Sequence, residues 1–218
     1  MELTRQIDLY CERLDPGFWA EPVNAATNLA FILGALFCWA MLGGKRDLGA
    51  RVLTLLLLAV GVGSFLFHTY ATRWAGIADV APITGFILVY VYFATTRFFD
   101  MPRWAGLAAV VAYFPYAYVV TWAVRQSFGS LNGSVAYAPV PLLILAYAAV
   151  LTFRDRDTAR GLAIGAGLLI MSLAFRTIDE AACPGLPIGT HFLWHILNGI
   201  LLSWMIVVMH RARPPELL

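Results

Sequence analysis

Long apolar runs recur along the whole chain and are separated by short polar stretches. Seven of these runs are long enough to cross a bilayer as helices, which takes about 20 residues each. They are too long and too continuously apolar to be the strands of a membrane barrel. The pattern therefore predicts an all-α membrane protein, a single seven-helix domain over residues 1–218 with a polar N-terminal segment over residues 1–21. We expect the seven spans at 22–42, 52–71, 78–96, 104–124, 135–153, 161–177 and 190–209.

The composition agrees with this interpretation. Hydrophobic residues make up 61% of the chain and charged residues 13%, whereas a soluble domain carries about 25% charged residues. The mean hydropathy is +0.75. The first 20 residues lack the apolar stretch of a cleavable signal peptide, and the basic residues form no patch for nucleic acid. We expect a multi-pass protein that works on a membrane lipid, and the sequence indicates no protein partner.

The positive charges predict an orientation. Lys and Arg in short loops mark the cytoplasmic side of a membrane protein. Of the fifteen Lys and Arg residues, ten fall on one side of the seven predicted spans. The other side holds the remaining five, Arg5, Arg13, Arg73, Arg125 and Arg176. The N-terminus is therefore expected outside and the C-terminus in the cytoplasm.

This orientation brings the unusual polar residues into one layer. Ser64 and His68 lie near the outer end of the second span, and Asp79 lies at the outer end of the third. His191 and His195 lie in the first turns of the seventh span. Each of the pairs Ser64/His68 and His191/His195 is spaced i, i+4 and so shares one helix face. The remaining histidine is 15 residues beyond His195, roughly 22 Å along a helix, and cannot share the site.

Two interpretations of these histidines stay open. A single histidine near a membrane interface is more often a packing residue, and HxxxH in a membrane helix is a weak metal signal by itself. Ionisable groups at membrane depth, however, are costly and mark function. Three histidines with a serine and an aspartate on three helices favour a metal site. Two imidazoles at i, i+4 can converge on one ion, and three protein ligands are typical of catalytic zinc, which makes water more acidic.

The same residues resemble the alkaline ceramidases, within the CREST superfamily of membrane hydrolases. The resemblance rests on "SFLFH" (Ser64, His68), on "ADVAPI" (Asp79) and on "HFLWHILNG" (His191, His195). It extends to "YCE" and "AEPVNAATNL" near the N-terminus. The family pattern is SxxxH, then Asp, then HxxxH, and all five positions are present in order.

The resemblance implies a zinc amidase that cleaves ceramide into a sphingoid base and a fatty acid. His68, His191 and His195 would then bind zinc. Asp79 would act as acid and base, and Ser64 would support the water or the oxyanion. The superfamily also includes receptors of the adiponectin type and enzymes that remodel the lipid of GPI anchors through an ester bond. A receptor or an ester hydrolase therefore remains an alternative.

The resemblance also implies a calcium site in the N-terminal segment. Glu12 and Glu21 match two acidic positions of the family, and Asp8 is the expected third, one residue further from Cys11 than in the family. A family asparagine falls on Leu14, and the loop is shorter. Carboxylate oxygens suit calcium, but a solvated acidic loop is an equally good interpretation.

The cysteines fit the same resemblance. Cys11 and Cys183 match a family disulfide that ties the N-terminal segment to the loop before the last span, whereas Cys38 lies inside the first span. Asp179 matches a family aspartate and could organise hydrogen bonds, although a loop-facing charge is the more ordinary role.

Two other functions are disfavoured. A retinal protein needs a lysine in a span, and the only lysine, Lys45, lies in a predicted cytoplasmic loop. A transporter is disfavoured because the sequence lacks the internal repeats with broken helices that would indicate one. We expect a bacterial inner-membrane protein whose site faces outward; an organelle membrane with a luminal site is the topologically equivalent alternative.

Overall fold

The computed structural model describes residues 2–44 and 46–212 and is all-α over them, apart from one isolated β-bridge. The predicted fold class is thereby confirmed for the described residues. The helices are α1 (Pro22–Thr27), α2 (Leu29–Leu42), α3 (Leu48–Tyr70), α4 (Arg73–Phe98), α5 (Arg103–Phe128), the 3-10 helix η1 (Ser134–Tyr137), α6 (Pro139–Leu151), α7 (Arg156–Thr177), α8 (Asp179–Ala182) and α9 (His191–Arg211).

Seven helical segments of the described chain are long and apolar enough to cross a membrane, so the chain is a multi-pass integral membrane protein. The first is formed by α1 and α2 together, and the fifth by η1 and α6. Two predicted loops are shorter than expected. The polar stretch after the second span is mostly the first turn of α4, since Ala71 reverses the chain with a left-handed backbone (φ 47°). Helix α7 begins at Arg156 because the Asp155 side chain accepts the N–H groups of Asp157 and Thr158.

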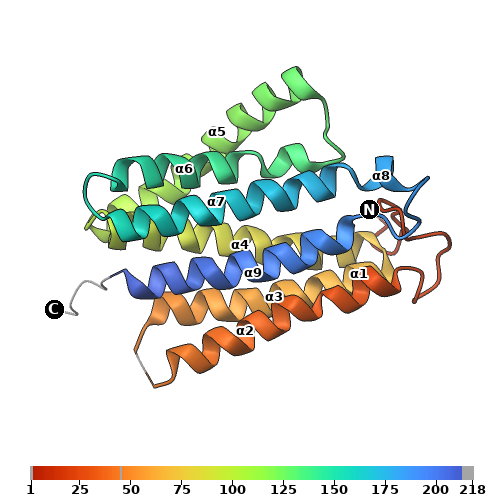
Figure 1. The fold of residues 1–218 in the computed structure, drawn as a ribbon, viewed down its shortest axis with the longest axis horizontal. Coiled ribbons are helices and arrows are strands. Elements are labelled where there is room, and N and C mark those ends of the chain that lie inside the picture. Colours follow the sequence, from red (N-terminus) through yellow and green to blue (C-terminus); the bar gives the residue numbers. More distant parts are fainter. Residues whose placement is uncertain (1, 45, 213–218) are drawn as a thin grey trace.

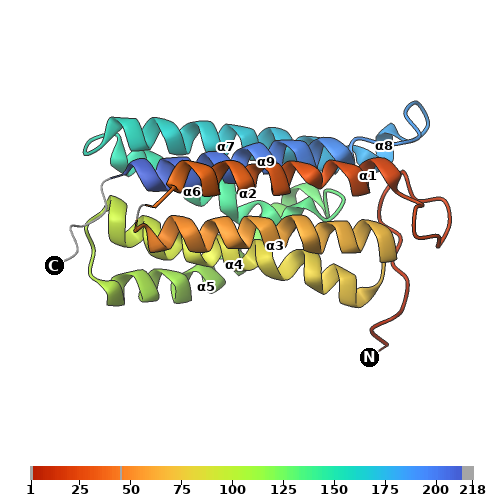
Figure 2. The ribbon, with the colours of Figure 1, turned by 90° about the horizontal axis from the view of Figure 1, so that it is seen from below.

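The long helices run side by side along one axis (Figure 1). Helix α9 contacts α2, α3 and α7, and α3 packs along α4. Seen from below, α3 and α4 lie on one side of the bundle and α7 and α9 on the other (Figure 2). Helix α5 lies at the periphery, and its buried residues are Ala105 and Gly106. The N-terminal segment and the last turn of α9 lie at opposite ends of the bundle, as an odd number of crossings requires (Figure 1).

Buried apolar side chains fill the end of the bundle near the C-terminus, where Leu53, Ile206 and Met209 are enclosed. Most buried polar side chains lie instead near the first turns of α9 and the end of α3. Large apolar side chains such as Leu36 and Trp122 are exposed on the outer faces of α2 and α5. Exposed apolar surface of this kind suits contact with lipid.

Small residues allow close helix contacts where the polar groups gather. A Cβ on Gly63 of α3 would collide with the backbone carbonyl of Ala78 in α4. Pro82 lies in α4 one turn later, and a proline has no N–H to pair with that carbonyl. On the other side, a Cβ on Gly199 of α9 would come within 2.9 Å of the backbone of Ala30 in α2. These contacts bring α3 against α4 and α9 against α2 around the polar layer.

The opposite end of the bundle is held by a buried ion pair. The Asp47 carboxylate accepts hydrogen bonds from Arg97 at 2.6 and 3.1 Å and from the N–H of Ala50 at 3.1 Å. It also lies 2.9 Å from the imidazole of His210. Burial alone would raise the pKa of Asp47, but these hydrogen bonds and the Arg97 charge lower it to about 2. Asp47 thus joins the start of α3 to the ends of α4 and α9.

Candidate metal centre

Three buried histidines come together at the end of the bundle where the N-terminal segment lies. His68 is in the last turn of α3, while His191 and His195 occupy the first two turns of α9. One ring nitrogen of each lies within 4.8 Å of those of the other two. The ring centroids are 4.6 to 5.1 Å apart. Among the described residues, this is the one set of three or more His, Cys, Asp or Glu residues that is close enough to share an ion.

Hydrogen bonds leave ring nitrogens free to bind a metal. The Glu21 carboxylate lies 2.6 Å from Nδ1 of His68, so this nitrogen carries the proton and Nε2 keeps a lone pair. The Thr27 hydroxyl donates to the carbonyl of Val23 and lies 3.0 Å from Nδ1 of His195. It therefore accepts the His195 proton, which leaves Nε2 of His195 as an acceptor.

Two ring nitrogens of the three histidines are buried and have no hydrogen-bond partner in the described chain. They are Nε2 of His195 and Nδ1 of His191. Buried polar atoms are normally hydrogen-bonded, and exceptions require an explanation. A metal ion would satisfy them, and three imidazoles suit a transition metal such as zinc, which would keep a coordination position for water or substrate. The donor set therefore fits a metal ion.

Ser64 and Asp79 lie beside the histidines. Ser64 is one turn before His68 on α3, and its side chain lies beside Asp79 of α4. Oδ1 of Asp79 is buried and has no partner in the described chain. The contact of Gly63 with Ala78 brings the two helices close enough for this pair to form. The structure thus brings together all five residues that the sequence placed in one layer.

The N-terminal segment folds over this centre. Its backbone pairs with the α3–α4 turn, with Ile7 N–H donating to the Ala71 carbonyl and Arg73 N–H donating to the Arg5 carbonyl. The ring of Tyr10 stacks on His191 with centroids 3.6 Å apart. Burial raises the pKa of Tyr10 above its ordinary range. Sequence reasoning gave Tyr10 no role, although it belongs to the "YCE" stretch that carried the resemblance.

Two links hold the segment in place. Cys11 forms a disulfide with Cys183, and their Cα atoms are 5.6 Å apart. Asp179 is fully buried. Its carboxylate accepts the N–H groups of Cys11 at 3.0 Å, Thr190 at 2.7 Å and His191 at 2.8 Å. Asp179 therefore caps the start of α9 and anchors the N-terminal segment. Of the two roles considered from the sequence, it organises hydrogen bonds and is not a charge facing solvent from a loop.

The acidic residues expected to bind calcium are used separately. Asp8 is exposed. The two oxygens of Glu12 accept the N–H groups of Val23 (2.6 Å) and Asn24 (2.8 Å) and so cap α1. Burial raises the pKa of Glu12. The structure does not bring Asp8, Glu12 and Glu21 together as ligands of one ion.

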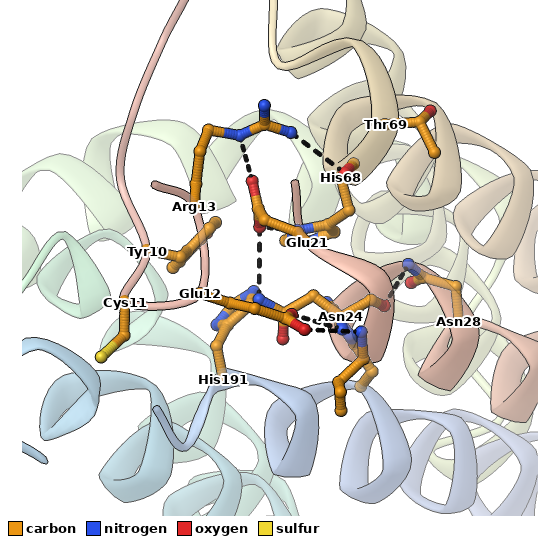
Figure 3. Close-up of polar contacts among 12 residues, drawn as sticks. Tyr10, Cys11, Glu12, Arg13, Glu21, Asn24, Asn28, His68, Thr69 and His191 are labelled. Carbon is orange, nitrogen blue, oxygen red and sulfur yellow. Dashed lines mark hydrogen bonds and ion pairs between the residues drawn. The ribbon is translucent and has the colours of Figure 1, made fainter. Parts of the chain in front are cut away.

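Glu21 lies between two buried groups (Figure 3). One oxygen accepts from Nε of Arg13 at 2.5 Å and the other from Nδ1 of His68 at 2.6 Å. Burial by itself would raise the pKa of Glu21, but the hydrogen bonds and charges of His68 and Arg13 lower it. A carboxylate on the outer nitrogen of a metal-binding histidine fixes its tautomer and orientation. Glu21 therefore supports the metal centre from outside the ligand set.

Arg176, which the sequence assigned only to the outer basic residues, also reaches the site. Its guanidinium lies 5.6 Å from the ring centroids of both Tyr137 and Trp194 and 6.0 Å from that of Tyr10. It donates to the Asn132 carbonyl at 2.6 Å. The sequence did contain a signal for this residue. An arginine at the end of an apolar span is costly to bury in the membrane, and such residues usually have a functional or structural partner.

An apolar cavity lies inside the bundle, and its lining on α9 begins at Trp194, within one turn of His191 and His195. Trp194 and Asn198 line it beside the histidines, and Leu201 and Met205 line it further down α9. Met205 is ten residues beyond His195, which is roughly 15 Å along a helix. The cavity wall includes residues of α4, α6 and α7. A narrow apolar chain attached to a polar group at the metal centre would fit this arrangement.

Comparison with known proteins yields a family and one curated relative. A family model described as Ceramidase matches residues 10–215, which include every candidate metal, catalytic and disulfide residue except Asp8. The chain is 26% identical over 144 residues to an uncharacterized sensor-like histidine kinase of Chloroflexus aurantiacus. That match covers 66% of this chain and 24% of the relative, so the chain spans about a quarter of the length of that protein.

Proposed function

Because the chain belongs to the ceramidase family, which matches it over residues 10–215, we propose that it is a zinc-dependent membrane hydrolase. It cleaves the amide bond of ceramide or a related lipid amide to a sphingoid base and a fatty acid. The observation that carries this proposal is the buried set of His68, His191 and His195, whose ligand atoms lie within 4.8 Å of one another. His68, His191 and His195 would hold the zinc. When bound, zinc supplies Lewis acidity, which polarises a carbonyl oxygen and makes water more acidic.

Asp79 is the proton carrier of the proposed reaction. Amide hydrolysis adds water to the carbonyl carbon, breaks the C–N bond and moves one proton from water to the leaving nitrogen. The unpartnered Oδ1 of Asp79 can accept the proton from water and then donate it to that nitrogen. The Ser64 hydroxyl lies beside Asp79 and can donate either to its carboxylate or to the oxyanion of the tetrahedral intermediate.

The apolar cavity supports a lipid substrate. Its lining by Leu201, Met205 and other apolar side chains would take the acyl chain, which leaves the amide at the histidines. Because the histidines are 1% exposed or less, little bulk water surrounds the reacting groups. We place the protein in a bacterial inner membrane with this end facing outward, as the positive charges indicate.

The test is a lipid-panel hydrolysis assay with the purified protein, run with and without a zinc chelator. The panel contains ceramides, other lipid amides and the corresponding esters. We expect about one zinc per chain and release of fatty acid from an amide. The variants His68→Gln, His191→Gln and Asp79→Asn should hydrolyse none of the lipids, and the two histidine variants should also lose zinc.

His210→Gln is the matched control, because His210 lies at the other end of the bundle beside Asp47. It should keep both zinc and activity. Full activity in His191→Gln would overturn the assignment of the site. Cleavage of esters alone would leave the metal centre in place but replace the amidase by an esterase. A response to a ligand without turnover of any lipid would favour the receptor alternative.

A further inference from the structure

A buried guanidinium occupies the middle of the N-terminal segment. Arg13 is 5% exposed, although it belongs to a loop on the surface of the bundle. Its guanidinium donates to the Glu21 carboxylate at 2.5 Å and to the carbonyl of His68 at 3.1 Å. It also donates to the carbonyls of Asp15 and Gly17, each at 3.2 Å. One positive charge is therefore surrounded by four oxygen atoms from three parts of the chain.

These oxygen atoms are of the kind that a hard cation prefers. Calcium is bound by about six to eight oxygens, which include carboxylates and backbone carbonyls. Here the four oxygens of these kinds already accept hydrogen bonds from Arg13 (Figure 3 shows its bonds to Glu21 and His68). Of the residues expected to bind calcium, Asp8 is exposed and Glu12 accepts two backbone N–H groups. Leu14, at the position of a family asparagine, is 88% exposed. The residues present therefore do not fit a calcium ion.

We propose that Arg13 is the built-in cation of this segment and makes the metal centre independent of calcium. The proposal rests on the metal centre of the proposed function. An arginine stays charged at all physiological pH values, and its planar fork offers five donors in fixed directions. It can therefore neutralise Glu21 and bind the 13–17 loop permanently. A metal ion in its place would do so only when the free metal concentration exceeded its dissociation constant.

Arg13 acts on the centre as a positioning residue through two contacts. Through Glu21, it holds the carboxylate that fixes the tautomer of His68. Through the His68 carbonyl, it binds the C-terminal end of α3, where helix carbonyls lack partners and favour positive charge. Both the side chain and the backbone of one metal-binding histidine are thus attached to the same guanidinium.

The first measurement uses the purified wild-type chain, stripped of calcium with EGTA. We expect addition of millimolar calcium to leave the melting temperature and the rate of zinc loss to a chelator unchanged. A higher melting temperature or slower zinc loss in calcium would overturn the proposal. Neither readout requires turnover, so failure here is distinct from failure of the proposed hydrolysis, which the zinc content and the lipid assay decide.

The second measurement compares Arg13→Met with Arg5→Met. Both remove an arginine from the same segment, but the Arg5 side chain is exposed. Loss of the group that orients a metal ligand typically weakens metal binding by about 10- to 100-fold. We expect zinc affinity to fall by this factor in Arg13→Met, at a temperature where the variant is folded, and to stay unchanged in Arg5→Met. Equal zinc affinity in the two variants would refute the positioning role. If Arg13→Met does not fold, the calcium titration of the wild type still decides the proposal.

Discussion

Replacing Glu21 by glutamine separates the roles of charge and shape at the metal centre. Glu21 is 3% exposed and accepts from Arg13 at 2.5 Å and from Nδ1 of His68 at 2.6 Å. Glutamine has the same shape but one oxygen and one NH₂ group, so it can accept from only one of these two donors. If the oxygen faces Arg13, the NH₂ group faces His68, and the imidazole must accept at Nδ1. The proton then moves to Nε2, the nitrogen that would bind the metal.

The size of this effect follows from the contacts. Mutation of a carboxylate that orients a metal-binding histidine costs about 10- to 100-fold in metal affinity, which is about 1.4 to 2.8 kcal/mol. In addition, Arg13 loses its buried counter-charge, and breaking a buried ion pair costs about 3 to 5 kcal/mol of stability. We therefore expect Glu21→Gln to bind zinc more weakly and to melt at a lower temperature.

The assay measures zinc transfer to a chromogenic chelator and, separately, thermal unfolding in detergent. Glu180→Gln is the matched control, since Glu180 is exposed at the same end of the bundle, and it should resemble the wild type in both readouts. A Glu21→Gln protein that melts earlier but retains zinc with wild-type affinity would refute the reasoning. In that case Glu21 would serve the fold alone and would not determine the tautomer of His68.

Two further predictions concern the helix contact and the opposite end of the bundle. Gly63→Ala places a Cβ against the backbone of Ala78, and overpacking of this kind costs about 1 to 3 kcal/mol. It should lower stability and hydrolysis, whereas Gly167→Ala, which has open space around it, should change neither; unchanged activity in Gly63→Ala would show that α3 and α4 need not be so close. Asp47→Asn should lower the melting temperature because Arg97 loses its partner. Because the folded-state pKa of Asp47 is lowered to about 2, its stabilisation, about 2 kcal/mol, is fully present above pH 4 and is lost as the pH falls towards 2. The difference in melting temperature between wild type and Asp47→Asn should shrink below pH 4, and a constant difference would contradict this assignment.

The histidine cluster could be predicted from the sequence because it depends on short-range patterns. Apolar run lengths predicted the seven spans, and the i, i+4 spacing of His191 and His195 placed both on one face of a helix. Because successive spans cross the membrane in opposite directions, His68, Ser64 and Asp79 were then expected in the same layer as these two histidines. Each of these steps uses only helix geometry and the thickness of a bilayer.

The surroundings of the three histidines could not be predicted in this way, because they depend on contacts between distant parts of the chain. Whether Asp179 faces solvent or caps α9 depends on the path of the loop that precedes α9. Stacking of Tyr10 on His191 requires the N-terminal segment to fold over the bundle. Hydrophobic periodicity contains no information on such loop paths, since it reports only which face of a helix is buried.

The sequence by itself determined the membrane class, the seven helices and the three histidines, since these follow from hydrophobic period and spacing. The tertiary structure decided what surrounds the histidines. In the sequence, Glu12 and Glu21 are indistinguishable acidic residues of one segment. In the structure, Glu12 caps α1, whereas Glu21 joins Arg13 to His68. The reason is that a buried carboxylate pairs with whichever donors the fold brings within hydrogen-bonding distance, and those donors lie up to 47 positions away along the chain.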